Sequence, residues 1–362
     1  MTLTYLDLTP DQRASLDALP FDGNHLVSGP PGSGKSLLAA QRAVMLSLTG
    51  PPVALLTRSN LLRQSLAATV HALAAPTDRG VRVTTAHAWL ARWYDGKAPT
   101  TADGWYDWSA LFDRAADTGP APDLTLVVDE GQDLPPEFYR LCRMLGARVT
   151  VFADECQRLT DTHSTLAEIA GRLGRCARHD LDGNHRNTEQ IASFAAHFRT
   201  GPGTPLLPDR QGPPPRLHRF PERGAADLLA LLAARHPGDT IGVIVNSKHT
   251  QFSLLGSLSR RAPRLKPQLY TSDAKGGQYR NLDLGRPGIV IVHRASAKGL
   301  GFDTVIVPDT HTDAATDPTS AALRMTYYVL ATRARRELHL GYEGTAEPPL
   351  LAQVGRGHLM RG

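Results

Sequence analysis

One segment of the sequence has the residue types and spacing that suit the binding of phosphate groups. Gly29-Pro30-Pro31-Gly32-Ser33-Gly34-Lys35-Ser36 fits the pattern G-x-x-x-x-G-K-S. It follows a short apolar run at 25–27 and opens a helix-like stretch at 37–45, which is the context this pattern requires. Its glycines let backbone N–H groups converge on phosphate oxygens, and the helix start adds positive charge. We expect Lys35 to neutralise the β- and γ-phosphates of a nucleotide and Ser36 to hold Mg²⁺.

A second segment offers carboxylates at the end of a buried strand. The apolar run at 124–128 leads directly into Asp129-Glu130-Gly131-Gln132-Asp133. Such a strand places its carboxylates at the carboxyl edge of a sheet, beside the phosphate-binding loop. We expect Asp129 to reach Mg²⁺ and Glu130 to orient and polarise an attacking water.

These two segments need a sheet to hold them, and the apolar pattern supplies one. Short continuous apolar runs alternate with helix-like stretches in both halves of the chain, which is typical of buried parallel strands in a doubly wound α/β sheet. The runs lie at 25–27, 53–56, 81–83, 124–128 and 149–152, and then at 241–245, 288–292, 305–307 and 338–340. A stretch rich in proline and glycine at 201–215 is expected to be a stiff surface connection.

Composition excludes several classes of protein. The 362 residues are 41% hydrophobic and 21% charged, which describes a globular chain and excludes disorder over most of its length. No apolar run approaches the roughly 20 residues that span a bilayer, and we expect a cytoplasmic protein without a secretory signal. Three scattered cysteines argue against a disulfide framework, and the spacing of the 14 histidines matches no zinc pattern. The net charge of +5, carried mostly by arginine, permits a nucleic-acid partner without requiring one.

The order of these and further motifs resembles that of the UvrD/Rep/PcrA-like helicases of superfamily 1. The segments that carry the resemblance, beyond the phosphate-binding loop, are Leu8-Thr9-Pro10-Asp11-Gln12, Thr57-Arg58-Ser59-Asn60, Thr85-Ala86-His87, Asp129-Glu130-Gly131-Gln132-Asp133, Ala153-Asp154-Glu155-Cys156-Gln157, Leu181-Asp182-Gly183-Asn184-His185-Arg186, Ala297-Lys298-Gly299-Leu300-Gly301-Phe302-Asp303 and Tyr328-Val329-Leu330-Ala331-Thr332-Arg333-Ala334. They extend from about residue 8 to residue 340, nearly the whole chain.

The resemblance implies an α/β fold of two tandem RecA-like P-loop NTPase domains, each a mostly parallel sheet flanked by helices, with ATP between them. We expect the first, ATP-binding domain at 1–178 and the second at 179–362. The family's large accessory subdomains are missing. Only short insertions remain, at about 91–123 and 247–287, so the chain is similar to a bare motor core.

The resemblance also implies roles for individual residues. Gln12 would read the adenine base, Gln157 would sense the γ-phosphate, and Gly299 would join the nucleotide-binding residues. Arg186 and Arg333 would act as arginine fingers that stabilise the charge developing during hydrolysis. The expected contacts to a single strand are Thr57, Asn60, Thr85, His87 and Trp89. Gly301 stands where the family usually has a glutamate that touches the ribose.

Two clusters allow more than one interpretation. All four tryptophans lie between residues 89 and 108, with Tyr94 and Tyr106 beside them. They could form a stacking platform for bases, a protein-binding hot spot, or a small aromatic core that closes the shortened insertion. The second cluster is a basic stretch formed by Arg260, Arg261, Arg264, Lys266, Lys275 and Arg280, which suits either a phosphate backbone or a solvated surface loop.

Two hypotheses of function follow. The first is an ATP-dependent DNA translocase or helicase acting on single-stranded DNA, with RNA as the alternative strand, in repair or antiviral defence; the family analogy implies movement from 3′ to 5′. The second is an ATP-gated regulatory subunit that docks on a nuclease or a defence effector and unwinds little itself. In both cases the expected ligands are ATP and Mg²⁺, and no membrane is involved.

Overall fold

The computed structural model of the chain describes residue 5 and residues 8–73, 80–95, 97–102, 104–121, 123–154, 164–200, 207–221, 224–272 and 279–362. The chain forms two compact units, Met1–Asp182 and Gly183–Gly362. Each unit is built on one sheet, and the neighbouring strands described in the two sheets run parallel. The expected α/β fold of two RecA-like domains is confirmed.

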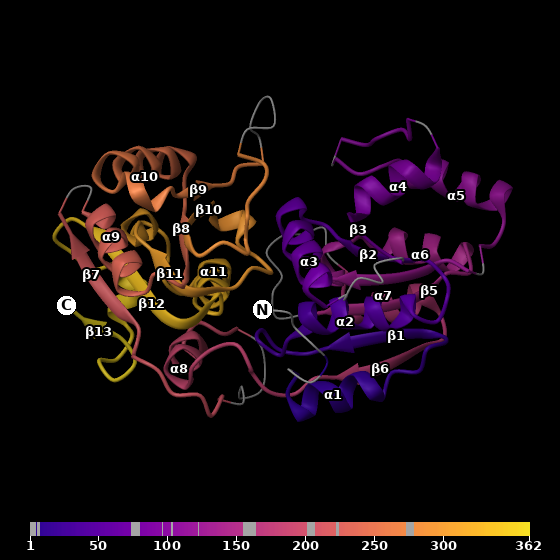
Figure 1. Cartoon of the computed structure of the whole chain (residues 1–362), viewed down its shortest axis with the longest axis horizontal. Helices are drawn as coiled ribbons and strands as arrows, with labels where there is room; N and C mark the ends of the chain where they lie inside the picture. Colours follow the sequence, from indigo (N-terminus) through magenta and orange to yellow (C-terminus); the bar gives the residue numbers. More distant parts are fainter. Residues whose placement is uncertain are drawn as a thin grey trace. The chain divides into compact units, whose positions relative to one another are not determined.

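The first unit has a sheet of strand order β3-β2-β4-β5-β1-β6 (Figure 1). Its strands are β1 (Asn24–Ser28), β2 (Val53–Thr57), β3 (Val81–Thr85), β4 (Thr125–Asp129), β5 (Arg148–Ala153) and β6 (Cys176–Asp180). Its helices are α1 (Pro10–Asp17), α2 (Lys35–Ser47), α3 (Asn60–Leu73), α4 (Ala86–Tyr94), α5 (Trp108–Thr118), α6 (Pro136–Met144) and α7 (Leu166–Leu173).

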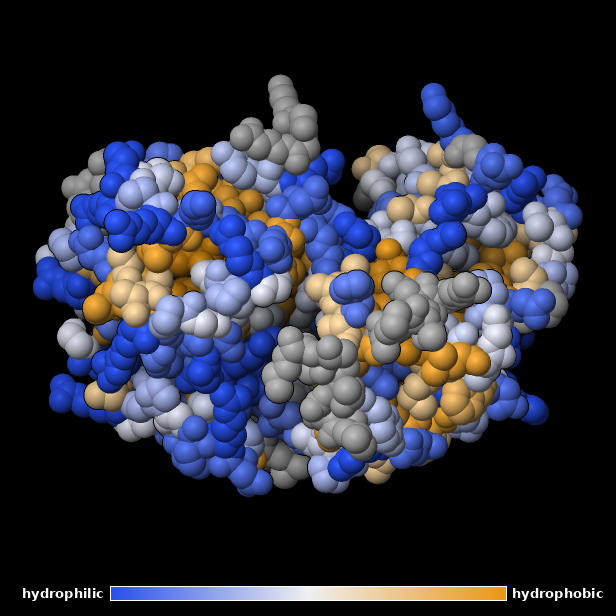
Figure 2. Space-filling model, viewed as in Figure 1, coloured by the Kyte–Doolittle hydropathy of each residue, from blue (hydrophilic) through white to orange (hydrophobic). Residues whose placement is uncertain are grey.

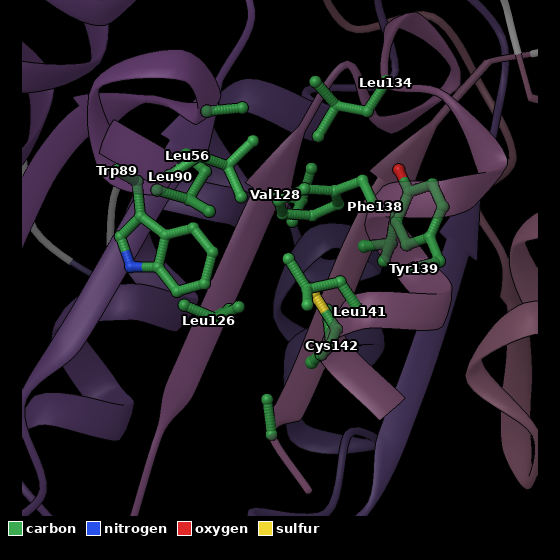
Figure 3. Close-up of a cluster of buried hydrophobic side chains, with 14 of the residues drawn as sticks. Leu56, Trp89, Leu90, Leu126, Val128, Leu134, Phe138, Tyr139, Leu141 and Cys142 are labelled. Atoms are coloured by element: carbon green, nitrogen blue, oxygen red, sulfur yellow. The ribbon is translucent and has the colours of Figure 1, made fainter. Parts of the chain in front are cut away.

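Helices cover both faces of this sheet because alternate strand residues point to opposite sides. In β2, Leu55 packs in the apolar cluster shared with α1, α2 and α3, whereas Leu56 packs in the cluster shared with α4 to α7. Figure 3 shows the second cluster, in which Leu56, Leu126 and Val128 from the strands meet side chains of α4 and α6. Both faces being buried explains why the strands read as continuous apolar runs.

The second unit has a sheet of strand order β13-β7-β12-β11-β8-β10-β9. Its strands are β7 (Arg216–Phe220), β8 (Thr240–Val245), β9 (Gln268–Leu269), β10 (Gly288–His293), β11 (Phe302–Val307), β12 (Ala334–Glu343) and β13 (Met360–Arg361). Its helices are α8 (Glu189–Ala196), α9 (Ala225–Arg235), α10 (Lys248–Arg261), α11 (Ala321–Ala331) and α12 (Pro349–Ala352). Helices α9 and α10 pack with β8, β10 and β11 in one apolar cluster.

All nine apolar runs coincide with strands, but the pattern missed β6 and β7 and the two-residue strands β9 and β13. Strand β6 is the edge of its sheet and reads Cys-Ala-Arg-His-Asp, without a buried residue. An edge strand needs no apolar run, because solvent covers much of it. The expected domain boundary at 178 falls inside β6, whereas the two units divide after Asp182.

The short insertions differ in content. Residues 91–123 hold the end of α4 and helix α5, which closes over the sheet through Leu111 and Ala115. Residues 247–287 hold α10, a short 3₁₀ turn at Pro263–Leu265 and β9. No described helix combines the length and apolar character needed to cross a lipid bilayer.

Candidate nucleotide site

Five segments of the first unit meet at the carboxyl edge of its sheet. Because all the strands are parallel, the segments that follow them emerge at the same edge. The phosphate-binding loop follows β1, Asp129 ends β4, and Asp154 follows β5. The expected strand-contact segments follow β2 and β3, whose last residues Thr57 and Thr85 are paired in register. The fold thus gathers on one edge what the sequence separates by about 130 residues.

The loop at 29–36 has a backbone that only glycine adopts easily. Gly32 and Gly34 have φ angles of 88° and 92°, in the left-handed region, and α2 begins at Lys35 directly after them. Helix α2 therefore directs its free N–H groups and the positive end of its dipole towards the loop. The Ser33 hydroxyl is buried and has no hydrogen-bond partner in the described part of the chain. These features suit an anion held in the loop.

Gln12 packs directly against this loop. Its side-chain amide donates to the Ser33 carbonyl at 3.2 Å, and its side-chain oxygen accepts from the Thr9 amide at 3.1 Å within the cap of α1. A Cβ added to Gly34 would lie 2.2 Å from Gln12 Nε2. The structure thus shows Gln12 bracing the phosphate-binding loop, and its expected contact with adenine stays a prediction.

Lys35 is buried and held by oxygen atoms. Its ammonium donates to the carbonyls of Gly29 at 2.6 Å and Pro30 at 2.9 Å, and pairs with an Asp154 carboxylate oxygen at 3.2 Å. The Lys35 and Asp154 side chains are 7% and 2% exposed. A buried cation requires such partners, and phosphate oxygens would offer the same chemistry.

Asp129 and Ser36 form the second element of the site. The Ser36 hydroxyl is hydrogen-bonded to the Asp129 carboxylate, while Asp129 Oδ2 is buried without a partner in the described chain. Burial and then the neighbouring Glu130 carboxylate raise the pKa of Asp129 to about 7. A cation would relieve both effects, and carboxylate and hydroxyl oxygens are ligands that Mg²⁺ prefers. These residues therefore fit a magnesium ion.

Glu130 is fixed by an unusual backbone and by a neighbour. Its φ angle is 54°, which is uncommon for a residue other than glycine and is often found at functional sites. Its carboxylate accepts from the Gln132 side-chain amide at 2.6 Å, and the Gln132 oxygen accepts from the Asp154 amide at 3.0 Å. Gln132, fully buried, therefore links the carboxylate of Glu130 to the backbone of Asp154, whose side chain holds Lys35.

The expected strand contacts lie at the ends of β2 and β3 and at the starts of the helices α3 and α4 that follow them. Thr57 is 1% exposed, and its hydroxyl has no partner in the described chain. The Asn60 side chain accepts from Arg63 at 3.0 Å, and the Thr85 hydroxyl caps α4 by accepting from the Ala88 amide at 3.2 Å. His87 stacks on Trp105 with ring centroids 4.1 Å apart, and burial lowers its pKa. Their roles towards a strand stay predictions.

Trp89 lies in the core of the first unit. It is 8% exposed and packs near Phe138 and Trp93, with ring centroids 6.0 and 6.4 Å away. Figure 3 shows it beside Leu90 and Leu126. Trp105 is 2% exposed, and the other aromatic residues of the cluster pack against the same core. This packing matches the small aromatic core and does not suit the strand contact expected for Trp89, because its ring faces are covered.

The second unit brings its two expected arginine fingers to one carbonyl. Arg186 and Arg333 both donate to the Leu300 oxygen, at 3.4 and 3.2 Å. Arg333 is 1% exposed and also donates to the Val329 carbonyl and the Thr332 hydroxyl. Burial of this kind does not suit a finger that reaches for a phosphate unless its side chain moves.

Glycines flank this pair of arginines. Gly299, expected to bind nucleotide, has a φ angle of 77° in the turn before β11. A Cβ at Gly301 would lie 3.5 Å from Arg186 Nε and 3.5 Å from Arg335 Nε. The position at which the family has a glutamate is therefore bordered by guanidinium groups.

Some residues of the site escaped the sequence reasoning. Gln132 and Asp154 lie in two of the segments that resemble the helicase motifs, but their spacing did not predict the contacts of Gln132 with Glu130 and of Asp154 with Lys35. Asn187 was also missed; its buried side chain donates to the Thr332 carbonyl at 3.3 Å and to the Ala334 carbonyl at 2.5 Å. Gln157 lies outside the described residues. Within the described ranges, no group of three or more His, Cys, Asp or Glu side chains is placed to hold a metal by itself.

Comparisons with known proteins support the fold. No protein-family model matches this sequence, and no curated protein matches it as a relative. Saccharomyces cerevisiae Dbp5 bound to RNA and ADP BeF3 is similar with a TM-score of 0.53 and 13% identity, over 99% of this chain and 94% of that one. At this identity the likeness concerns the fold alone.

Two further solved structures are similar at lower TM-scores. The C-terminal domain of a possible DNA helicase from Lactobacillus plantarum has a TM-score of 0.37 and 26% identity, over 49% of this chain and 97% of that one. The PRRSV helicase has a TM-score of 0.43 and 13% identity, over 92% of this chain and 54% of that one, so this chain spans about half its length. At these TM-scores neither supports an inference about the site.

Proposed function

We propose that this protein is an ATPase that uses Mg²⁺-ATP to act on single-stranded nucleic acid, as a translocase or helicase of the superfamily 1 type. One observation carries the proposal. Lys35, Ser36, Asp129 and Glu130 meet at one sheet edge, where the Ser33 hydroxyl and Asp129 Oδ2 are buried without protein partners in the described chain. Unpaired buried polar atoms are costly, and a bound nucleotide with its metal would pair them.

Each residue then has a distinct task. The loop at 29–36 binds the phosphates through its backbone N–H groups, and Lys35 exchanges carbonyl and carboxylate partners for phosphate oxygens. Ser36 and Asp129 would hold Mg²⁺, which neutralises charge on the phosphates. Glu130, oriented by Gln132, accepts hydrogen bonds from the attacking water and polarises it. Gln12 and Gly299 complete the nucleotide-binding set, and Gln157 is assigned to sensing the γ-phosphate.

The second unit contributes positive charge in this proposal. We assign Arg186 and Arg333 to the charge that develops on the transferred phosphoryl group. Asn187 holds the segment from Thr332 to Ala334, so it fixes the backbone on either side of Arg333. A rotation of the Arg333 side chain away from Leu300 must accompany this role.

The proposed substrate is single-stranded DNA, with RNA as the alternative, in DNA repair or antiviral defence. Thr57, Asn60, Thr85 and His87 lie at the carboxyl ends of neighbouring strands of the ATP-binding sheet, which supports a contact that responds to the nucleotide. Dbp5 with RNA and ADP BeF3 illustrates that a chain of this fold can hold both kinds of ligand.

The test is the steady-state ATPase rate with and without single-stranded DNA or RNA, beside a Glu130→Gln variant. We expect a rate that a strand raises several-fold and that Glu130→Gln lowers by about 100-fold or more. If the Glu130→Gln variant hydrolyses ATP as fast as the wild type, the assignment of the hydrolytic site is refuted.

A second candidate function rests on burial. In the second unit Arg333 is 1% exposed. In the first unit Trp89 and Trp105 are core residues, and the half-buried Trp93 and Trp108 pack against the same core. These features favour an ATP-gated regulatory subunit that binds a nuclease or defence effector and unwinds little itself. An ATPase rate indifferent to every strand, together with recovery of a partner that binds only with ATP, would favour this candidate over the motor.

A further inference from the structure

The positive charge of the chain is concentrated in one short segment of the second unit. Residues 246–287 contain eight Lys or Arg and two Asp, while the rest of the chain contains 32 basic and 33 acidic residues. The whole net charge of +5 therefore originates here. A basic segment on an otherwise neutral protein is the electrostatic footprint of a polyanionic ligand.

Several of these cations are exposed and lack an acidic partner among the described residues. Arg260 is the next-to-last residue of α10, Arg264 lies in the following 3₁₀ turn, and Lys266 follows that turn. All three are exposed, and none forms an ion pair within the described part of the chain. Arg261 is different, because it pairs with Asp227 of α9. The cations at 260, 264 and 266 thus remain available to a ligand.

An exposed aromatic ring lies on the same helix. Phe252 is 45% exposed and touches Tyr279 edge to face, with ring centroids 5.8 Å apart. Tyr279 has a φ angle of 62°, and its carbonyl accepts from the Thr271 amide at 3.0 Å, which fixes it beside α10. An exposed ring such as that of Phe252, held in place by an edge-to-face contact with Tyr279, is suited to stacking on a base.

The ring and the cations are close enough to act together. Phe252 and Arg260 are eight residues apart, about 12 Å along the helix axis. A Cβ at Gly256 would lie 3.4 Å from Arg260 Nη1, so the guanidinium folds back towards the turn between them. Leu255, Leu265 and Tyr279 pack against the same apolar cluster, which keeps the turn after α10 at its side. In Figure 2, apolar and strongly hydrophilic side chains lie next to each other where Figure 1 shows α10 and β9.

We propose that this surface, formed by Phe252, Arg260, Arg264, Lys266 and Tyr279 and here named the α10 surface, binds single-stranded nucleic acid. The cations neutralise backbone phosphates, and Phe252 stacks on an unpaired base. A duplex keeps its bases paired and offers no face to Phe252, which is why we infer a single strand. The inference rests on and deepens the proposed function by adding a strand contact on the second unit, but the binding itself needs no ATP hydrolysis.

The experiment measures binding of fluorescein-labelled dT20 and U20 to the full chain by fluorescence anisotropy, without nucleotide, at several salt concentrations. One variant carries Arg260→Ser, Arg264→Ser and Lys266→Ser, and a second carries Phe252→Ala. The matched control carries Arg172→Ser, Arg175→Ser and Arg178→Ser, three exposed arginines of the first unit. Thermal unfolding verifies that each variant is folded.

We expect the triple variant to lower the slope of log K against log salt by about 2, because each phosphate contact on a single strand contributes about 0.7. Its affinity near 0.1 M salt should fall by roughly 10- to 100-fold. Phe252→Ala should weaken binding by about 5- to 100-fold with an unchanged slope. The control should bind like the wild type, and comparison of dT20 with U20 decides which strand is preferred.

Wild-type affinity and slope in both folded α10 variants would overturn the proposal, as would an equal loss in the control. A blunt duplex that competes as well as dT20 would overturn the assignment to single strands. Failure of the two proposals can be told apart. A strand-stimulated ATPase with unaffected α10 variants refutes only the α10 surface, whereas α10-dependent binding without any ATPase refutes only the proposed function.

Discussion

Replacing Asp154 by asparagine tests how the buried ammonium of Lys35 is balanced when no phosphate is present. In the structure this ammonium is 3.2 Å from an Asp154 carboxylate oxygen, and both side chains are nearly inaccessible to solvent. Asp154→Asn keeps the size and polarity of the side chain but removes its charge. The folded protein then carries a buried cation that keeps its hydrogen bonds to the carbonyls of Gly29 and Pro30 and its longer-range attraction to the Asp129 carboxylate, but has lost its ion pair.

The size of the effect follows from the geometry. At 3.2 Å and an effective dielectric constant of about 20, the attraction between the two charges is about 5 kcal/mol. The two carbonyls and the asparagine amide recover part of it, so we expect a loss of about 2–4 kcal/mol in the free energy of unfolding. For a unit of this size that corresponds to a melting temperature lower by roughly 5–15 °C.

A nucleotide should reverse this loss. Phosphate oxygens supply negative charge to Lys35 in the variant as in the wild type. Bound nucleotide should therefore restore to the variant the stability that the loss of the Asp154 charge removed, and should stabilise the wild type less. By linkage, its affinity for a non-hydrolysable ATP analogue should increase, by about tenfold for each 1.4 kcal/mol recovered. The wild-type carboxylate, in contrast, competes with the phosphates for Lys35.

The assay is thermal unfolding and isothermal titration calorimetry with the analogue, with Asp117→Asn on the exposed side of α5 as the matched control. The control should change neither quantity. A folded Asp154→Asn variant with wild-type stability, or one that binds the analogue more weakly than the wild type, would refute the reasoning that Asp154 balances Lys35 and is displaced by phosphate.

Three other perturbations address the packing around these sites. Gly131→Ala should lower the free energy of unfolding by about 1–3 kcal/mol, because the new Cβ would lie 2.3 Å from Val151 Cγ1. In a double-mutant cycle measured by urea denaturation, Val151→Ala should relieve part of this loss, and strictly additive losses would contradict the reasoning. His218→Gln should remove an acid sensitivity of the second unit. Burial and then the neighbouring His339 lower the pKa of His218 to about 4, so the unfolded chain binds the proton first and stability is lost as pH falls from about 6.5 towards 4. Urea melts at pH 7 and pH 5 should show a loss in the wild type only. It should be clearly smaller than the limit of about 1.4 kcal/mol per pH unit, because solvent screens this half-buried ring. Parallel losses in both proteins would be evidence against it. Asn187→Ala leaves two carbonyls of the segment at 332–334 without their donor and should cost about 2–3 kcal/mol in thermal unfolding of the second unit, with a loss below 0.5 kcal/mol as the contrary outcome.

Local pattern was sufficient for much of the fold. Eight of the nine apolar runs became strands with buried cores, because a strand covered on both faces needs apolar residues at every position. The ninth, β3, lies at the edge of its sheet and has no buried residue, although Val81 and Val83 pack against the core. The loop at 29–36 could be located because its glycines, its lysine and the following helix are adjacent in sequence. Asp129 and Glu130 could be placed at the sheet edge because the end of a strand is itself a position in the sequence.

Edges and packing resisted prediction for equally physical reasons. Strand β6 is solvated at the edge of its sheet, so selection for apolar side chains is weak there and the run that marks other strands is missing. Trp89 follows an expected strand-contact segment, and composition could not distinguish a stacking platform from an aromatic core. Its burial against Phe138 depends on where α6 packs, about 50 residues further along the chain.

By itself, the sequence determined the fold class, the phosphate-binding loop and the order of the segments along the chain. Only the tertiary structure decided which atoms meet. Lys35 and Asp154 are 119 residues apart, and their contact exists because β1 and β5 are neighbours in the sheet. The contact of Arg333 with Leu300 likewise depends on the pairing of β11 with β12. The bridge from Glu130 through Gln132 to Asp154 depends on the pairing of β4 with β5. Residue spacing fixes local backbone geometry, whereas contacts across a sheet depend on strand order, which no single segment encodes.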